Sequence, residues 1–498
     1  MRRPPKDKQG REITAPPTVT PNLGSRRNSA GEKVELVRQV REYELITPLY
    51  GGGVEPAHAD PLTTVRVPGI RGHLRFWWRA CRATQFSTVA EMKREEDSIW
   101  GSTEQPSAVV LELKLDDKAA VKKEPAYWME RNPRTGRPAL KNSHQVHTYA
   151  AFPLQPKKEE REQAGWKSGD ILTGVCFSLR LSFPGHLIIP RAGSAEGRKV
   201  DVKKEVEAAL WAWETFGGVG ARTRRGFGAL VLRSIDGEKV PPTQSRNLGE
   251  TISRKLGGHV LRGDAPEGIP HLKTDMSVFG PLELAQAGAR ESAPRPPHDM
   301  AVCLTPLAPG GIDKHPELLV WSELIEKLRD FRQCRSEKEA GEYPPRGHSY
   351  WPEPRMIKKL LRREKEPLDV EKFPRAEFGL PIIFHMPRLG DLEATLKGLR
   401  VKEADKDFER LASRLILRPL RCADGAVGVA LILEAPRTPP GGLMLSWVKD
   451  RVTAREPVDS QLSEDEAAEL THRLEPLGGR TDVLQAFLQY LTVRRSQR

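Results

Sequence analysis

A glycine- and arginine-rich run at residues 214–230, ETFGGVGARTRRGFGAL, holds residue types suited to binding phosphate. Glycine permits left-handed backbone and close approach of another molecule. Arginine presents a planar fork of donors that fits a phosphate group. The candidate contacts are Gly217, Gly218, Gly220, Arg222, Arg224, Arg225, Gly226 and Gly228. The run predicts a phosphate site, and the phosphate belongs either to a nucleotide cofactor or to a nucleic-acid backbone.

The order of the predicted elements disfavours a nucleotide cofactor. Walker and dinucleotide loops follow a strand and open a helix whose N-terminus faces the phosphate. Here residues 203–216 predict a helix before the loop, and residues 227–232 predict a strand after it. The loop therefore predicts backbone contact with several phosphates or with an RNA strand, without base recognition. Taken alone, the same loop is equally consistent with a glycine turn carrying solvated arginines.

A second group of arginines lies in GIRGHLRFWWRACRA, residues 69–83, which has helical period. The apolar stripe of this helix consists of Ile70, Leu74, Trp77 and Cys81. The cationic stripe consists of Arg71, Arg75, Arg79 and Arg82. We expect Arg71, Arg75 and Arg79 to bind RNA phosphates from one side of this helix. Trp77 and Trp78 are of a type that stacks on unpaired bases, but the helical phase favours core packing for both.

The composition points to a polyanionic partner. The chain has 498 residues, with 80 Lys and Arg against 67 Asp and Glu and a formal charge of +13. Its five cysteines form no C-x-x-C pair, so neither a zinc site nor a disulfide framework is indicated, and we expect no metal and no cofactor. No run is apolar enough for a membrane span, so we expect no membrane partner and a cytoplasmic protein.

Strands and helices alternate along the chain, which predicts an α+β protein with helices packed on antiparallel sheets. Period 2 predicts strands at 33–50, 108–115, 174–183, 227–232, 380–386, 413–422 and 427–435. Period 3.6 predicts helices at 69–83, 203–216, 319–333, 353–365 and 480–495. We expect a disordered basic tail at 1–33, a first module at 34–240 with an insertion at about 117–169, a linker at 241–300, and a second module with C-terminal helices at 301–498.

Several motifs in order resemble the RAMP superfamily of CRISPR-associated proteins. In the first half they are TPLYGGG (47–53), VRVPGIRGHLRFWWRA (65–80) and FGGVGARTRRGFG (216–228). In the second half they are HSYWPEPRMIK (348–358), FPRAEFGLPIIF (373–384) and SRLILRPL (413–420). Within the superfamily, the set is most similar to the family of the first-numbered Cmr subunit of the type III-B effector complex.

The resemblance implies two ferredoxin-like (RRM-type) RAMP modules and a place in an antiviral, RNA-guided ribonucleoprotein. Its implied partners are crRNA, target RNA and the other Cmr subunits, with a role in holding the 3′ region of the guide and the target. We expect replacement of Arg224 and Arg225 by Glu to weaken RNA binding with little loss of folding. A protein scaffold, whose arginines serve acidic neighbours, is a weaker alternative.

The alternative from the enzyme class is a metal-independent RAMP endoribonuclease that processes guide or precursor RNA. The candidate acids and bases are His58, Asp60, His73, His144, His147 and Tyr149. No acid and base converge in the sequence, so we assign no catalytic residue. The second module has four further arginines near its predicted strands, Arg375, Arg414, Arg418 and Arg421. They predict either an extension of the basic RNA-binding surface or ordinary ion pairs.

Overall fold

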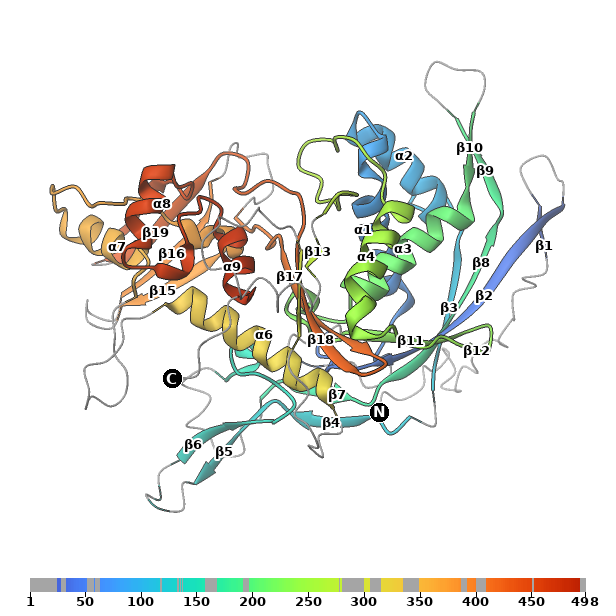
Figure 1. Ribbon diagram of the computed structural model, residues 1–498, viewed down its shortest axis with the longest axis horizontal. Coiled ribbons are helices and arrows are strands. Elements are labelled where there is room, and N and C mark those ends of the chain that lie inside the picture. Colours follow the sequence, from blue (N-terminus) through green and yellow to red (C-terminus); the bar gives the residue numbers. More distant parts are fainter. Residues whose placement is uncertain are drawn as a thin grey trace, which may run out of the picture.

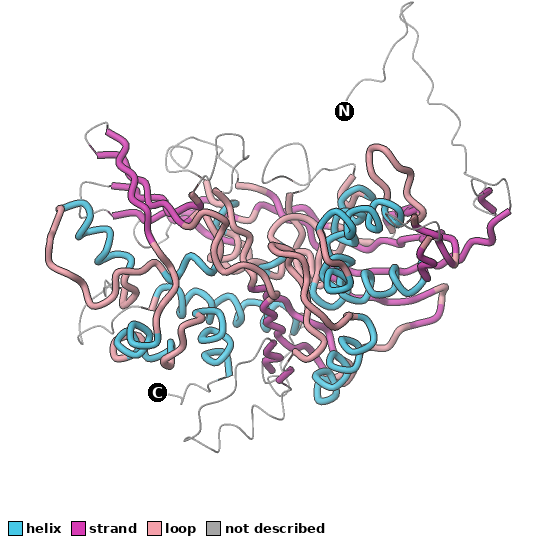
Figure 2. The backbone as a smooth tube through the Cα atoms, turned by 90° about the horizontal axis from the view of Figure 1, so that it is seen from above, coloured by secondary structure: helices cyan, strands magenta, loops and turns pink. Residues whose placement is uncertain are grey.

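The computed structural model shows a protein of helices and mainly antiparallel sheets (Figures 1 and 2). It describes residues 25–27, 33–51, 58, 63–116, 119–131, 134, 136, 138–156, 168–190, 197–276, 278–279, 300–304, 315–334, 349–386, 392–399, 409–449 and 452–492. None of the helices in these ranges is long and apolar enough to cross a lipid bilayer.

The first half is built on one antiparallel sheet in the order β12-β11-β2-β8-β3. Its strands are β2 (Lys33–Leu45), β3 (Val110–Leu115), β8 (Cys176–Pro184), β11 (Leu230–Ile235) and β12 (Glu238–Lys239). The helices between them are α1 (Val67–Arg82), α2 (Val89–Trp100) and α3 (Val202–Phe216). All the strands and helices predicted in this half are confirmed, whereas α2 was not predicted.

Alternation along the strands decides which face of this sheet is covered. In β8, Phe177 and Leu179 are buried while Arg180 is exposed, as period 2 requires. Tyr43 of β2 lies on the covered face, with its ring 5.3 Å from that of Trp213 in α3. Helices α1 and α3 therefore bury one face of the sheet and leave the other open.

Ser25–Arg27 form strand β1, which pairs antiparallel with the beginning of β2. Residues 1–24 and 28–32 of the tail expected to be disordered lie outside the described residues. The long β2 presents unpaired backbone groups at its start, and β1 satisfies some of them.

The insertion at about 117–169 contains short strands that pair among themselves and with β7 (Asp170–Thr173). They are β4 (Lys122–Pro125), β5 (Tyr127–Arg131) and β6 (Pro138–Asn142), with pairs β4–β7 and β5–β6. The base of the insertion shares a core with the second half, through Ala126, Tyr127 and Leu154. A separate hairpin, β9 (His186–Ile189) with β10 (Arg198–Asp201), extends from the first sheet.

The second half contains two four-stranded sheets. One has the order β13-β14-β18-β17 and consists of Val278–Phe279, Met300–Leu304, Gly425–Ile432 and Leu415–Cys422. The other has the order β15-β16-β19-β20 and consists of Ile382–Met386, Leu392–Gly398, Leu443–Lys449 and Val452–Val458. The helices are α6 (Pro316–Gln333), α7 (Glu353–Arg362), α8 (Glu464–Thr471) and α9 (Val483–Thr492). The elements predicted for this half are confirmed, and β13, β14, β16, β19, β20 and α8 were not predicted.

Helix α4 (Leu248–His259) lies in the region expected to link the two halves and packs on the first core through Ile252 and Leu256. Strands β17 and β18 lie between the two halves (Figure 1). Figure 2 shows the same arrangement from above, with a helical body on each side of a central junction.

A buried arginine holds this junction together. Arg418 of β17 is 0% exposed. Its guanidinium donates to the carbonyl oxygens of Glu214 (2.9 Å), Gly217 (2.7 Å) and Leu230 (2.7 Å). Burial lowers the pKa of this guanidinium to about 9. The second half thus fixes the end of α3 and the start of β11 in the first half.

We predict that Arg418→Met lowers the free energy of unfolding by at least about 3 kcal/mol, because each buried carbonyl left without a donor costs about 1–3 kcal/mol. Urea unfolding monitored by circular dichroism measures the change. Arg180→Met is the control, since Arg180 forms an exposed ion pair with Glu112 and its loss should cost below about 1 kcal/mol. Equal midpoints for the two variants would contradict the assignment.

Candidate nucleic-acid interface

The glycine loop, residues 217–228, is shaped by left-handed backbone at Gly220, Arg222, Gly226 and Gly228. The loop closes on itself, with the Val219 amide donating to the Gly228 carbonyl at 2.9 Å. A Cβ on Gly218 would lie 2.9 Å from that carbonyl oxygen. A Cβ on Gly217 would collide with Trp213 of α3. Glycine is therefore required here for the loop's own packing.

Two other glycines allow close approach by distant parts of the chain. A Cβ on Gly226 would lie 2.5 Å from Nε1 of Trp321 in α6, and a Cβ on Gly220 would lie 2.8 Å from the Tyr50 carbonyl oxygen. The Trp321 indole donates to the Arg225 carbonyl at 2.6 Å. The sequence predicted close approach of another molecule, and in the structure other parts of the same chain lie close to these two glycines.

The three loop arginines donate to backbone carbonyls. Arg222 is exposed and donates to Ala150 (2.7 Å). Arg224 donates to Ser413 and lies over the Phe76 ring. Arg225 donates to Leu415 (2.9 Å) and Phe378 (3.2 Å). Arg224 and Arg225 thus bind the second half, and Arg222 remains on the surface. The RNA contacts of these arginines stay a prediction, which the geometry favours most at Arg222.

The charges of these three arginines are not neutralised locally. Within the described residues, none of them forms an ion pair with a carboxylate. Burial lowers the pKa of the Arg225 guanidinium to about 9, and the nearby Arg332 and Arg222 add to this effect. Carbonyl oxygens satisfy the donors but leave the net charge in place. The loop is therefore a centre of positive potential.

The arginines of α1 are in a different situation. Arg71 donates to the Trp100 carbonyl (3.0 Å) and to Ser107 Oγ (2.6 Å). Arg75 and Arg79 both form ion pairs with Glu96 of α2. The unpredicted α2 brings carboxylates against the cationic stripe, and RNA contact by Arg71, Arg75 and Arg79 stays a prediction. Trp77 and Trp78 are buried, which confirms the core interpretation.

A pocket of about 250 Å³ lies between the glycine loop and the start of α1, and we call it the α1 pocket. It is lined by Gly51, Arg66, Gly69, His73, Gly220 and Ala221, among others. No side chain caps the N-terminus of α1. A helix N-terminus carries amide donors without intrahelical partners and favours an anion. Burial lowers the pKa of His73. The pocket joins all three motifs of the first half.

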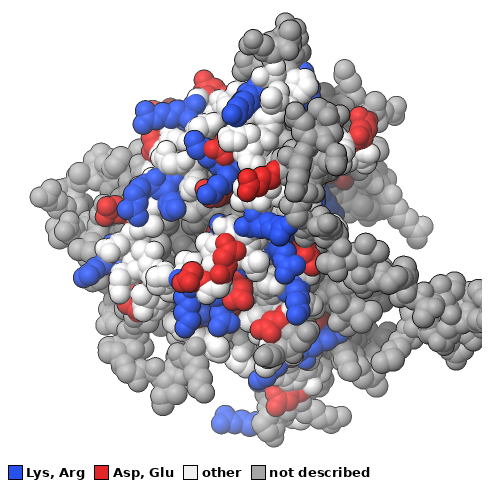
Figure 3. Space-filling model, turned by 90° about the vertical axis from the view of Figure 1, so that its right-hand side faces the viewer, with Lys and Arg blue, Asp and Glu red and all other residues white. Residues whose placement is uncertain are grey.

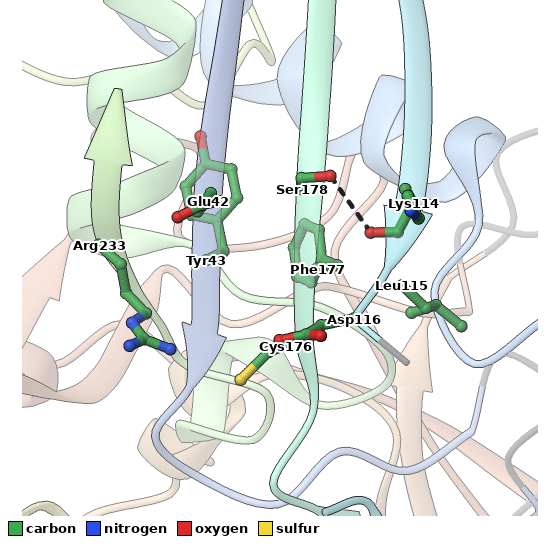
Figure 4. A pocket seen from close by; sticks show the side chains of 9 residues that line it. All are labelled: Glu42, Tyr43, Lys114, Leu115, Asp116, Cys176, Phe177, Ser178 and Arg233. Atoms are coloured by element: carbon green, nitrogen blue, oxygen red, sulfur yellow. Dashed lines mark hydrogen bonds between the residues drawn. The ribbon is translucent and has the colours of Figure 1, made fainter. Parts of the chain in front are cut away.

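The open face of the first sheet is less suited to holding a nucleic acid. It carries a pocket of about 460 Å³ whose lining mixes Glu42 and Asp116 with Lys114 and Arg233 (Figure 4). The aromatic residues of these strands, Tyr43 and Phe177, are buried in the core. Figure 3 likewise shows basic and acidic side chains interspersed over the described part of one face. This sheet presents neither stacking rings nor a field of one sign.

The histidine candidates are separated and engaged in different contacts. His58 contacts Asp170 (2.9 Å), His144 contacts Gln145 (2.8 Å), and His147 contacts Glu326 (2.6 Å). Tyr149 accepts from Arg332 at 2.9 Å. Asp60 lies outside the described residues. Among the described residues, no group of three or more His, Cys, Asp or Glu is arranged to hold a metal ion.

The second-half arginines form internal contacts. Arg375 pairs with Glu353, Arg414 pairs with Glu377 and Asp482, and Arg421 pairs with Glu317 and Glu44. Arg418 is buried and donates to backbone carbonyls, as described above. These four arginines therefore act as ion-pair partners and internal donors, and they do not form a continuous basic track.

The sequence from residue 42 to residue 231 matches the model of the RAMP superfamily. The matched stretch holds most of the first sheet, the α1 pocket and the glycine loop. Among curated proteins, it is similar to the CRISPR system Cmr subunit Cmr1-2 of Pyrococcus furiosus. The two are 27% identical over 210 residues, which cover 40% of this chain and 97% of that subunit.

Two solved structures are also similar to this chain. The apo crystal structure of Cmr1 from Pyrococcus furiosus has 16% sequence identity and a TM-score of 0.41, over 80% of this chain and 88% of that one. A chain of the type III-B Cmr-beta complex bound to cognate target RNA, determined by cryo-EM, has 13% identity and a TM-score of 0.42. That match covers 92% of this chain and 100% of the other.

We predict that replacing Arg224 and Arg225 together by Glu lowers the free energy of unfolding by more than about 3 kcal/mol, since the buried carbonyls of Ser413, Leu415 and Phe378 lose their donors. This reverses the expectation from the sequence of little loss of folding. Urea unfolding tests it, with the exposed Arg222→Glu as the control, for which the loss should stay below about 1.5 kcal/mol. A double variant that unfolds at the wild-type midpoint would show that these arginines do not hold the junction.

Proposed function

We propose that this protein is a non-catalytic, RNA-holding subunit of a cytoplasmic type III-B Cmr effector ribonucleoprotein. The observation that carries the proposal is the arginine cluster of the glycine loop, which pairs with no carboxylate among the described residues and adjoins the α1 pocket within the stretch that matches the RAMP model. The similarity to a Cmr subunit supports the choice of complex. The proposed partners are crRNA, target RNA and the other Cmr subunits.

We further propose that both halves are ferredoxin-like modules, at 34–240 and 301–498. The order β11-β2-β8-β3, with α1 after β2 and α3 after β8, supports this for the first half. In the second half, β14, β18 and β17 with α6 form a similar but less complete set. On this proposal, residues 241–300 link the modules while α4 packs on the first core.

The RNA backbone lies across the α1 pocket in this proposal. Arg222 and Arg66 on the surface neutralise phosphates, and the N-terminus of α1 with the backbone of Gly220 accommodates another. Arg224 and Arg225 contribute positive potential while they hold the second module. Arg71, Arg75 and Arg79 act mainly by fixing α1 against α2. Sequence specificity comes from pairing of guide and target, and the protein recognises backbone and shape.

We predict that the full-length protein binds single-stranded RNA with an affinity that falls steeply with salt, because counterions compete for the phosphates. Arg222→Ala should weaken binding several-fold and reduce the slope of log K against log salt by about 0.7, the value for one phosphate on a single strand. Fluorescence anisotropy across a salt series measures both quantities. Arg180→Ala, on the open face, is the matched control and should leave the slope unchanged.

The same samples test the endoribonuclease alternative. A precursor RNA incubated with the protein in EDTA should stay intact on a denaturing gel. New RNA ends that disappear on replacing His144 or His147 would contradict the non-catalytic proposal. Binding that is insensitive to salt, or an Arg222→Ala variant identical to wild type, would contradict the proposed phosphate contact.

A further inference from the structure

Hairpin β5–β6 extends outward from the junction, below α6 (Figure 1). Its register places Trp128 directly opposite Lys141 and Met129 opposite Leu140. Directly opposed residues share a face, so Met129 and Leu140 lie on one side while Trp128 and Lys141 lie on the other. The first side is the inner one, because Leu140 packs against the second core.

The base of the hairpin is firmly anchored. Tyr127 is 1% exposed, and its hydroxyl donates to the Thr148 carbonyl at 3.1 Å. The Tyr127 amide donates to Ser168 Oγ at 2.8 Å. The Ser143 amide donates to the Ala126 carbonyl at 2.9 Å. Such anchoring on both sides of the hairpin fixes the direction in which the outer face points.

Trp128 is unusual for this chain. It is 40% exposed, whereas the other tryptophans in the described ranges are buried or half-buried. Burying a large apolar side chain stabilises a protein by about 1.5–3 kcal/mol, and the outer face of the hairpin forgoes part of that gain. The inner face already supplies the packing that the hairpin needs. The ring is therefore available to an external molecule.

The side chain directly opposite this ring is basic. Lys141 lies across the strand pair, and Lys122 and Lys123 of β4 are exposed at the base of the insertion. Asp170 pairs with Lys123, and Glu130 is the acidic residue on the outer face of the hairpin. An aromatic ring beside basic side chains is the pattern of single-stranded nucleic-acid sites, in which bases stack and phosphates are neutralised. The lysine opposite the ring favours a nucleic acid over an apolar protein surface.

We infer that the outer face of hairpin β5–β6 is a second RNA contact, in which Trp128 stacks on an unpaired base and Lys141 binds a neighbouring phosphate. The inference rests on the proposed function and adds a base-stacking site outside the α1 pocket. Stacking tolerates any base, so the site strengthens binding to unpaired RNA without selecting its sequence.

The test compares two probes with the full-length protein: a short oligouridine, and an abasic oligoribonucleotide of the same length. Trp128→Ala should weaken oligouridine binding about 5- to 150-fold, the range expected for losing one stacked base. It should leave abasic binding unchanged. Trp128→Phe should restore part of the affinity, and Lys141→Ala should weaken both probes. Phe152→Ala is the matched control, since Phe152 is an exposed aromatic (66%) elsewhere in the insertion.

The possible results distinguish failure of this inference from failure of the proposed function. Salt-sensitive oligouridine binding that Trp128→Ala leaves unchanged would overturn this inference and leave the proposed function intact. Equal loss on both probes would also overturn stacking, as would a defect confined to binding of another protein subunit. Failure of the wild-type protein to bind either probe would overturn the inference and the proposed function together. Thermal melting of each variant confirms that the fold is retained.

Discussion

The buried guanidinium of Arg418 is the contact on which the rest of the arrangement depends. It carries a positive charge in the interior and is satisfied by backbone carbonyls on both sides of the glycine loop. Because Arg418 belongs to the second half and these acceptors to the first, the two halves share one junction. Gly226 against Trp321 and Arg225 against β17 complete it. The shape of the glycine loop and the placement of the two halves therefore depend on the same contacts.

The total charge of the chain says little about where an anion binds. Arg75 and Arg79 lie on the surface of α1, yet Glu96 cancels much of their field. Among the described residues, Arg222, Arg224 and Arg225 donate to carbonyl oxygens and pair with no carboxylate, so their field persists into the solvent near the α1 pocket. The type of acceptor decides how much of an arginine's charge is cancelled locally. Exposure then separates Arg222 from its two neighbours.

Local periodicity was enough to predict helices α1, α3, α6, α7 and α9 and the longer core strands such as β2 and β8, because α1, α3, α6 and β8 each bury one clear face. Helix α2 was missed because VAEMKREEDSIW is largely charged, although its Thr88 and Glu91 form a capping box. The partners of the predicted arginines could not be predicted, since Arg225 and Leu415 are 190 residues apart and nothing local links them. Trp128 also has no distinctive sequence signal, because its strand alternates like any other.

Hydrogen–deuterium exchange of the full-length protein, with and without a saturating single-stranded RNA, tests most directly the claim that RNA occupies the α1 pocket while the junction stays closed. The account predicts RNA-dependent protection in residues 64–73 and 219–222. It also predicts slow and unchanged exchange in residues 415–418, whose backbone is paired in β17. Protection confined to the open face of the first sheet, at residues 176–180, would contradict it. So would RNA-dependent opening of β17.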